Sequence, residues 1–209
     1  MKMLVSYLML ISGIILSAGA CSPINEPQQI EEQTPAPDPE PDTDSQPTGE
    51  KILVVYFSCT NTTKGIAERI VEVSNAATWR IEPEVAYTSA DLNYNNSSSR
   101  ANREQNDPSA RPAIKGHCDN LAAYDVVFLG YPIWWGKAPK VIFTFLENHD
   151  LAGKTIVPFC TSHSSGIGSS DTDLHRLAGD AEWKPGRRFK GNESKETIEE
   201  WIKTTLTKE

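Results

Sequence analysis

An apolar run of strand length stops at a polar turn near residue 58, and a helical pattern begins about five residues later. The run is Lys51–Phe57, and the helix expected from about Thr63 carries Ile66, Ala67 and Ile70 on one face. Hydroxyl side chains crowd the turn, where the unpaired N–H groups and positive dipole end of a helix would also point. The pattern indicates an anion site large enough for a phosphate. For a single turn of this kind, ordinary Ser/Thr capping is the better explanation, so the assignment depends on the other loops.

The rest of the chain alternates apolar runs with amphipathic segments, which is typical of a parallel sheet covered on both faces. Residues 83–116 form a long polar stretch in which little can be placed. The expected strands are 51–57, 78–82, 125–130, 154–160 and 184–190, and the expected helices begin near residues 63, 139, 169 and 195.

Three polar or aromatic loops follow the first, third and fourth of these strands, at the edge where ligands collect in an open parallel sheet. The first is Ser58–Lys64. The second, Tyr131–Pro139, places two Trp rings on a Pro/Gly turn, where exposure is costly unless something flat covers them. The third, Thr161–Ser170, has small residues that let backbone approach a ligand. Together the loops suit flavin mononucleotide (FMN).

Residues 51 to about 206 resemble a flavodoxin-like domain, and Gly-Tyr-Pro-Ile-Trp-Trp-Gly (130–136) is especially characteristic of bacterial members of that group. The resemblance implies a doubly wound five-stranded parallel α/β sheet of order 2-1-3-4-5. It implies that the first loop holds the flavin phosphate, with Asn61 where the family usually has Gly, that the second flanks the flavin ring, and that the third meets its pyrimidine edge. The implied FMN-binding residues are Ser58, Thr60, Asn61, Thr62, Thr63, Pro132, Ile133, Trp134, Trp135, Gly136, Ser162, His163, Ser164, Ser165, Gly166, Ile167 and Gly168.

By this resemblance we expect an FMN-binding electron carrier or oxidoreductase, with no catalytic residue assigned and the redox chemistry supplied by the flavin. The alternative is a lipoprotein that keeps the fold and binds a ligand or partner without redox turnover. A Cys-based phosphatase is disfavoured, since the sixth residue after Cys59 is Gly65 and not Arg. No Gly-x-Ser-x-Gly motif supports a serine hydrolase.

Residues 1–20 read as a targeting segment, with Lys2, an apolar stretch from Leu8 to Leu16, and small residues before Cys21. The segment resembles a bacterial lipoprotein signal, which implies acylation of Cys21; an ordinary secretory signal cut near Ala20 is the alternative. We therefore expect a domain in the bacterial cell envelope, outside the cytoplasm and anchored to a membrane through lipid. Because nicotinamide cofactors are cytoplasmic, the expected electron donor is a redox protein or a membrane quinol.

Residues 21–50 are expected to be a tether, because segment 22–50 holds seven prolines, eight acidic residues and no Lys or Arg. The whole chain has a net charge of −8, but the eight acidic residues of segment 22–50 and Lys2 lie outside the expected folded domain. Residues 51–209 therefore have 19 basic and 20 acidic groups, a net charge of −1. A nearly neutral domain gives no support for nucleic-acid binding.

Three cysteines remain after Cys21, an odd number for an oxidising compartment. Cys59 and Cys160 should not form a disulfide. They lie at the carboxyl ends of the first and fourth strands, which the third strand separates by about 10 Å, and a disulfide needs Cα atoms within about 7 Å. Cys160 and His163 form the only candidate metal pair, and zinc needs three or four ligands. We assign no metal site.

Overall fold

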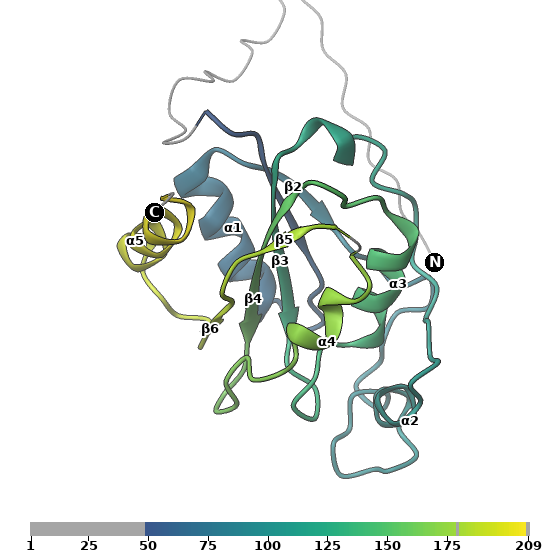
Figure 1. The fold of residues 1–209 in the computed structure, drawn as a ribbon. Coiled ribbons are helices and arrows are strands. Elements are labelled where there is room, and N and C mark those ends of the chain that lie inside the picture. The colour runs from purple at the N-terminus through teal and green to yellow at the C-terminus, as the bar shows by residue number, and fades with distance from the viewer. Residues whose placement is uncertain (1–48, 179, 208–209) are drawn as a thin grey trace, which may run out of the picture. The chain divides into compact units, whose positions relative to one another are not determined.

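The computed structural model describes residues 49–178 and 180–207. The expected signal segment, Cys21 and all but the last two residues of the expected tether lie outside this part of the chain. The described residues form a sheet with helices on both faces (Figure 1). Within residues 49–178 and 180–207, no helix is long and apolar enough to cross a membrane.

The sheet has the predicted strand order. β1 (Ile52–Tyr56) lies between β2 (Ala77–Arg80) and β3 (Val126–Pro132), and β4 (Thr155–Thr161) lies beyond β3. Every pairing is parallel. The order β2-β1-β3-β4-β5 is that of a flavodoxin-like doubly wound fold, which confirms the predicted fold class.

The structure divides the expected fifth strand into two short pieces. β5 (Glu182–Trp183) and β6 (Arg187–Phe189) each pair with β4. Pro185 lies in the break and has no N–H to donate to the sheet. Gly186 approaches β4 so closely that a Cβ there would meet Pro158 Cγ at 2.9 Å.

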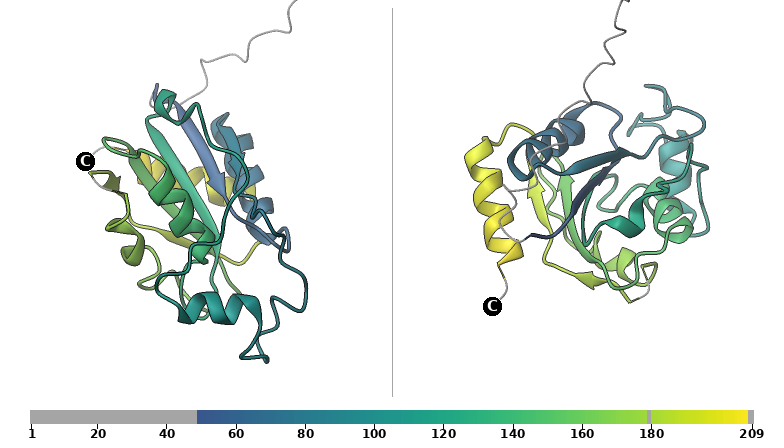
Figure 2. Two further views of the ribbon diagram at one scale, coloured as in Figure 1. Left: turned by 90° about the vertical axis from the view of Figure 1, so that its right-hand side faces the viewer. Right: turned by 90° about the horizontal axis from the view of Figure 1, so that it is seen from above.

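Alternation along the central strands builds one core on each face of the sheet. In β1, Leu53 and Val55 join one core, while Ile52 and Val54 join the other. Figures 1 and 2 show helices on both sides of the sheet. The first side has α1 (Thr62–Ser74) and α5 (Lys195–Leu206); the second has α2 (Arg100–Asn106), α3 (Lys140–Asn148) and α4 (Thr172–His175).

Helix boundaries differ slightly from expectation. Pro139 is the N-cap of α3 and not its first helical residue. The helix expected from Ser169 is only the single turn of α4, which begins after its N-cap Asp171. The Ser170 hydroxyl lies 3.1 Å from the Tyr131 hydroxyl, and the Asp171 carboxylate accepts from the Thr172 N–H.

The polar stretch 83–116 is an insertion between β2 and β3, and its residues pack against the loop that follows β3. It contains α2 and is closed at its ends by a bridge between Pro83 and Ile114. A short 3₁₀ helix (Leu121–Ala123) then leads into β3.

Candidate functional site at the carboxyl edge of the sheet

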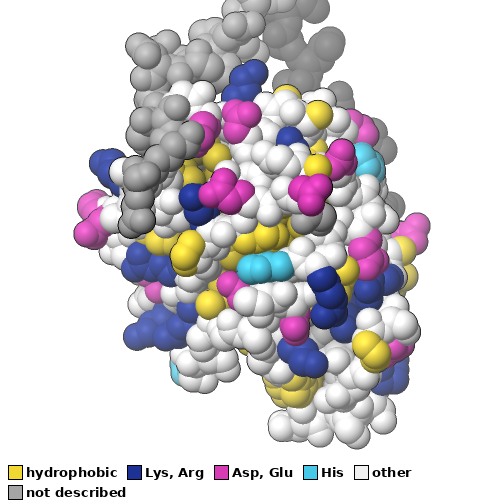
Figure 3. Space-filling view, viewed as in Figure 1, with side chains coloured by type: hydrophobic (Ala, Val, Ile, Leu, Met, Phe, Trp, Pro, Cys, Tyr) yellow, Lys and Arg dark blue, Asp and Glu magenta, His cyan; other side chains and the backbone are white. Residues whose placement is uncertain are grey.

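The three predicted loops lie at one edge of the sheet, because β1, β3 and β4 are parallel neighbours whose carboxyl ends point the same way. This edge is at the bottom of Figure 1. In the space-filling view the same edge is notched between the loop after β4 and the loop after β3 (Figure 3). Beside the first loop lies an open pocket of about 740 Å³.

The first loop ends in a helix whose N-terminus has no side-chain cap. Asn61 is the N-cap, with φ 64° and ψ 0°, and its side chain makes no capping hydrogen bond. The left-handed conformation is the one Asn tolerates better than most residues, so Asn61 makes the turn that Gly would otherwise make. The first amides of α1 are thereby left to face a ligand.

The hydroxyls of the first loop do not all face this pocket. Thr60 and Thr62 are exposed and line it. Thr63 is 1% exposed, and its hydroxyl lies 2.7 Å from the Thr161 hydroxyl, a contact that ties α1 to the end of β4. Ser58 is 4% exposed and does not line the pocket. The predicted phosphate role therefore fits the side chains of Thr60 and Thr62, whereas the Thr63 hydroxyl has a structural partner.

Sequence reasoning missed a cationic wall of the pocket. Arg69 lies two turns into α1, and its Nη1 donates to the Gly65 carbonyl at 3.0 Å and to the Gly191 carbonyl at 3.5 Å. Lys190, Gly191 and Asn192 follow β6 and form a second wall, which Arg69 contacts at Gly191. The sequence contained a signal for both cations. Arg69 lies four residues after Gly65, on the same face of the predicted helix. Lys190 is the last residue of a predicted strand, at the edge of the sheet where ligands bind.

Gly191 brings this second wall against the first loop. Its φ is 105°, and a Cβ there would lie 2.5 Å from Thr62 Cγ2. The carboxylate of Glu193 accepts from the N–H groups of Lys190 and Gly191, which holds this turn in place. These contacts fix the position of the second wall relative to the first loop.

The second loop is a tight hairpin turn with its two Trp rings in different environments. Trp134 and Lys137 exchange backbone hydrogen bonds of 2.9 and 3.0 Å, and both central residues have positive φ, Trp135 at 48° and Gly136 at 77°. Trp134 is 6% exposed and packs edge-on against Phe57. Trp135 is half-buried and is the ring of the pair that can present a face to a ligand.

The insertion supports this hairpin. Tyr94 stacks on Trp135 with ring centroids 4.1 Å apart, and its hydroxyl donates to the Ile133 carbonyl at 3.2 Å. The buried Gln105 of α2 donates to the Trp134 carbonyl at 2.9 Å and to the Ala138 carbonyl at 3.3 Å. Composition gave no signal for these contacts.

Two residues predicted to flank the flavin ring lie elsewhere. Ile133 is 8% exposed and belongs to the core, and Pro132 is the last residue of β3.

The third loop is anchored by its backbone and leaves its tip exposed. Arg188 Nη1 donates to the carbonyls of Ser162 and His163 at 3.1 and 3.3 Å. The Ser162 hydroxyl donates to the Ser165 carbonyl. Ile167 turns toward the protein and contacts Gly186, so its side chain does not face a ligand. His163 lines the pocket, and Ser164, Ser165, Gly166 and Gly168 are exposed.

The three described cysteines are free, including Cys59 and Cys160, as the strand order predicts. Burial raises the pKa of the Cys59 thiol to about 11, although the charges of Arg80 and Arg100 lower it. Burial also raises the pKa of Cys160 to about 12. Burial therefore disfavours the thiolate form of both residues at neutral pH.

We predict that Cys59 and Cys160 resist alkylation in the folded protein. A thiol pKa near 11 leaves about 100-fold less thiolate at neutral pH than an ordinary cysteine has. Iodoacetamide labelling at pH 7.5, followed by peptide mass spectrometry, should modify both residues only after unfolding. Labelling of native Cys59 at the rate of a cysteine peptide would contradict the burial.

A family model described as Flavodoxin matches residues 51–205. The chain belongs to the flavodoxin family. Its flavodoxin domain accounts for every described strand and helix, since the match begins just before β1 and ends within α5. No curated protein matches the chain.

Two solved structures are similar to this flavodoxin in sequence as well as fold. A candidate flavoprotein from Bacteroides eggerthii is 47% identical, with 76% of this chain and 99% of that chain covered and a TM-score of 0.72. A candidate flavoprotein from Bacteroides uniformis is 40% identical, with coverage of 74% and 98% and a TM-score of 0.70.

A more distant structure shares the fold alone. It is a flavoprotein in complex with FMN from Lactobacillus acidophilus, 22% identical, with coverage of 66% and 93% and a TM-score of 0.53.

Proposed function

We propose that this flavodoxin binds FMN and acts as an electron carrier or oxidoreductase in the cell envelope. The observation that carries the proposal is the uncapped N-terminus of α1 at Asn61, which opens into a pocket with Arg69 and Lys190 on its walls. Amides, hydroxyls and cations at one place suit a phosphate monoester. The FMN complex of the Lactobacillus acidophilus protein, which has the same fold, supports this choice of flavin.

The residues present fit FMN from one end to the other. The first amides of α1, with the hydroxyls of Thr60 and Thr62, would hold the phosphate. Trp135 would flank the flavin ring, and the exposed tip of the third loop, 163–166, would meet its polar edge. The bound flavin would supply one- or two-electron redox chemistry. The protein would orient the ring, limit access of water and set the potential through charge and hydrogen bonds.

We predict different roles for the two Trp residues of the second loop. Trp135→Ala should weaken FMN binding by about 1–3 kcal/mol, on the scale of aromatic–base stacking, and should cost less stability than Trp134→Ala, because Trp135 is only partly buried. Trp134→Ala should lower the free energy of unfolding by about 3–5 kcal/mol, because it empties a buried site. Fluorescence titration with FMN and urea unfolding would measure the two effects. The ring assignment is wrong if Trp135→Ala binds FMN as tightly as the parent.

Export and anchoring belong to the same proposal and rest on the sequence of residues 1–50. The signal has one Lys before its apolar stretch and no twin-arginine pair, so the chain would cross the membrane unfolded and acquire FMN outside the cytoplasm. Acylated Cys21 would anchor it, and a redox protein or membrane quinol would exchange electrons with it.

We predict that Cys21→Ala abolishes membrane anchoring. The parent should stay with the membrane fraction after a high-salt wash, because lipid and not charge holds it. The variant should be released or should accumulate unprocessed. Immunoblots of membrane and soluble fractions make the measurement, and a processed variant that remains in the membrane would exclude Cys21 as the anchor.

A further inference from the structure

The ligand edge of the sheet is basic although the domain is not. The four loop segments that form it, 58–64, 131–139, 161–170 and 188–192, contain Lys64, Lys137, Arg188 and Lys190 and no acidic residue. Residues 51–209 as a whole carry a net charge of −1. The 20 acidic groups of the domain therefore lie outside these four segments.

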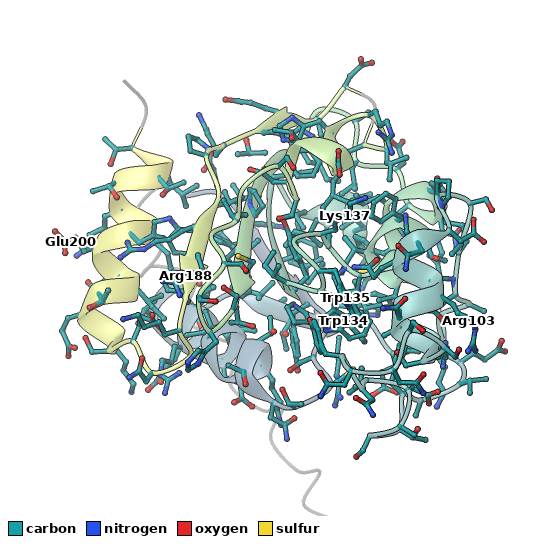
Figure 4. All side chains as sticks on the ribbon, turned by 90° about the horizontal axis from the view of Figure 1, so that it is seen from below. Arg103, Trp134, Trp135, Lys137, Arg188 and Glu200 are labelled. Atoms are coloured by element: carbon teal, nitrogen blue, oxygen red, sulfur yellow. The ribbon has the colours of Figure 1, made fainter. Side chains whose placement is uncertain are left out.

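Four cations of this edge have no carboxylate partner. Lys137 and Lys190 come from loops, Arg188 comes from the end of β6, and Arg103 comes from α2. We call these four residues the basic edge. None of them forms an ion pair within residues 49–178 and 180–207. Figure 4, seen from below, shows Arg188 and Arg103 on opposite sides of Lys137 and the two Trp residues.

The acidic groups nearest to this edge are already engaged. Glu68 pairs with Lys64 at 3.4 Å, and Glu104 pairs with Arg100 at 2.7 Å. Glu193 accepts backbone N–H groups, and Asp171 is 9% exposed and caps α4. Among the described residues, Glu68 and Glu104 are therefore paired with other cations, and no carboxylate lies within ion-pair distance of the basic edge, although the charge of Arg103 acts on Asp91.

A bound phosphate would use only part of this charge. Lys190 and Arg69 line the phosphate pocket and would offset a charge of about −2. Lys137 closes the turn that carries Trp135, and Arg103 lies in α2 to one side of that turn. Their charge remains for something that approaches the flavin edge from outside.

We propose that the basic edge is the docking surface for a redox protein with an acidic patch. This proposal rests on the proposed function and chooses a protein partner over a membrane quinol. A neutral quinol gains nothing from a row of cations, whereas an acidic protein surface is attracted and oriented by them. Trp135 is half-buried and lies in the same turn as Lys137, so a partner docked on the basic edge would lie close to the residues that flank the flavin.

Binding of cytochrome b5, which is acidic, and of mitochondrial cytochrome c, which is basic, tests the proposal. Thermophoresis with the full chain in neutral detergent should show cytochrome b5 bound at least about tenfold more tightly at 20 mM salt, with the preference lost near 500 mM. Lys137→Glu and Arg103→Glu should each weaken cytochrome b5 about fivefold at low salt. Lys51→Glu is the matched control, because it makes the same charge change at the exposed residue before β1, on the opposite edge.

Other outcomes would overturn the proposal. Equal binding of the two cytochromes, or equal effects of Lys137→Glu and Lys51→Glu, would show that the edge does not select an acidic partner. Protection of Lys137 from amine acetylation in phosphatidylserine vesicles, but not in phosphatidylcholine vesicles, would assign the edge to a membrane. If cytochrome b5 binds only after the acidic residues of segment 22–50 are replaced by their amides, the basic edge would be assigned to that acidic segment of the same chain. Each of these binding experiments can be made with protein that holds no FMN. A failure to bind flavin is therefore distinguishable from a failure to bind the partner protein.

Discussion

The full chain should bind FMN at least about 100-fold more tightly than riboflavin, which lacks the phosphate. The ratio corresponds to about 2.7 kcal/mol, the size of one or two hydrogen bonds to a charged group. Three features of the structure predict this preference: the uncapped amides of α1, the hydroxyls of Thr60 and Thr62, and the cations Arg69 and Lys190. Isothermal titration calorimetry with both ligands makes the measurement.

Arg69→Met isolates the cationic contribution to this preference. The variant keeps an unbranched side chain in α1 but removes the charge, so it should lower the FMN-to-riboflavin ratio about tenfold and leave riboflavin binding unchanged. Arg176→Met is the control, because Arg176 is exposed just after α4 and does not line the pocket. A ratio near one in the parent would contradict the phosphate site, and a ratio unchanged in Arg69→Met would exclude that cation.

Gly130→Ala should destabilise the fold by about 3 kcal/mol or more. Gly130 lies in β3 beneath the ring of Phe159, and a Cβ there would come within 2.1 to 2.7 Å of three ring atoms. The ring is fully buried between neighbours and cannot move aside without disturbing α5. Overpacking of this kind costs about 1–3 kcal/mol and occasionally more. Urea unfolding followed by far-UV circular dichroism measures the change.

The same substitution at Gly65 should stabilise the fold instead of destabilising it. Gly65 lies in the first turns of α1, and a Cβ there would meet only Arg69 Nη1, at an ordinary 3.6 Å. Ala is favoured over Gly in a helix by about 1 kcal/mol, so Gly65→Ala should raise the free energy of unfolding. Loss of stability in both variants to the same extent would show that packing on Phe159 is not the cause at Gly130.

The sequence was sufficient for the sheet and for the place of the site. Apolar runs of strand length and the loops after them predict an open parallel sheet, and the parallel order then brings the three loops to one edge. The turn at Asn61 was also predictable, because Asn is one of the few residues that adopt φ 64° readily. Local patterns were enough here, since each depends on residues close together in the chain.

Features that depend on distant residues were not predictable. Which Trp is buried is decided by Phe57 and Tyr87, which pack on Trp134 from other segments. The Thr63 hydroxyl, expected to face a ligand, instead meets Thr161, 98 residues away. Residues 83–116 lack a regular apolar period, yet Gln105 and Tyr94 within them hold the second loop. Their roles follow from tertiary contacts that composition does not encode.

The most direct test of the account is the flavin content of the purified full chain. The chain should be incubated with equal amounts of FMN, FAD and riboflavin, separated from free ligand, and examined by visible absorption and by mass spectrometry of the released flavin. We predict one FMN per chain, with neither of the other flavins retained in a comparable amount. A chain that retains no flavin, or retains riboflavin as well as it retains FMN, would contradict the assignment of the phosphate pocket at Asn61 and with it the proposed function.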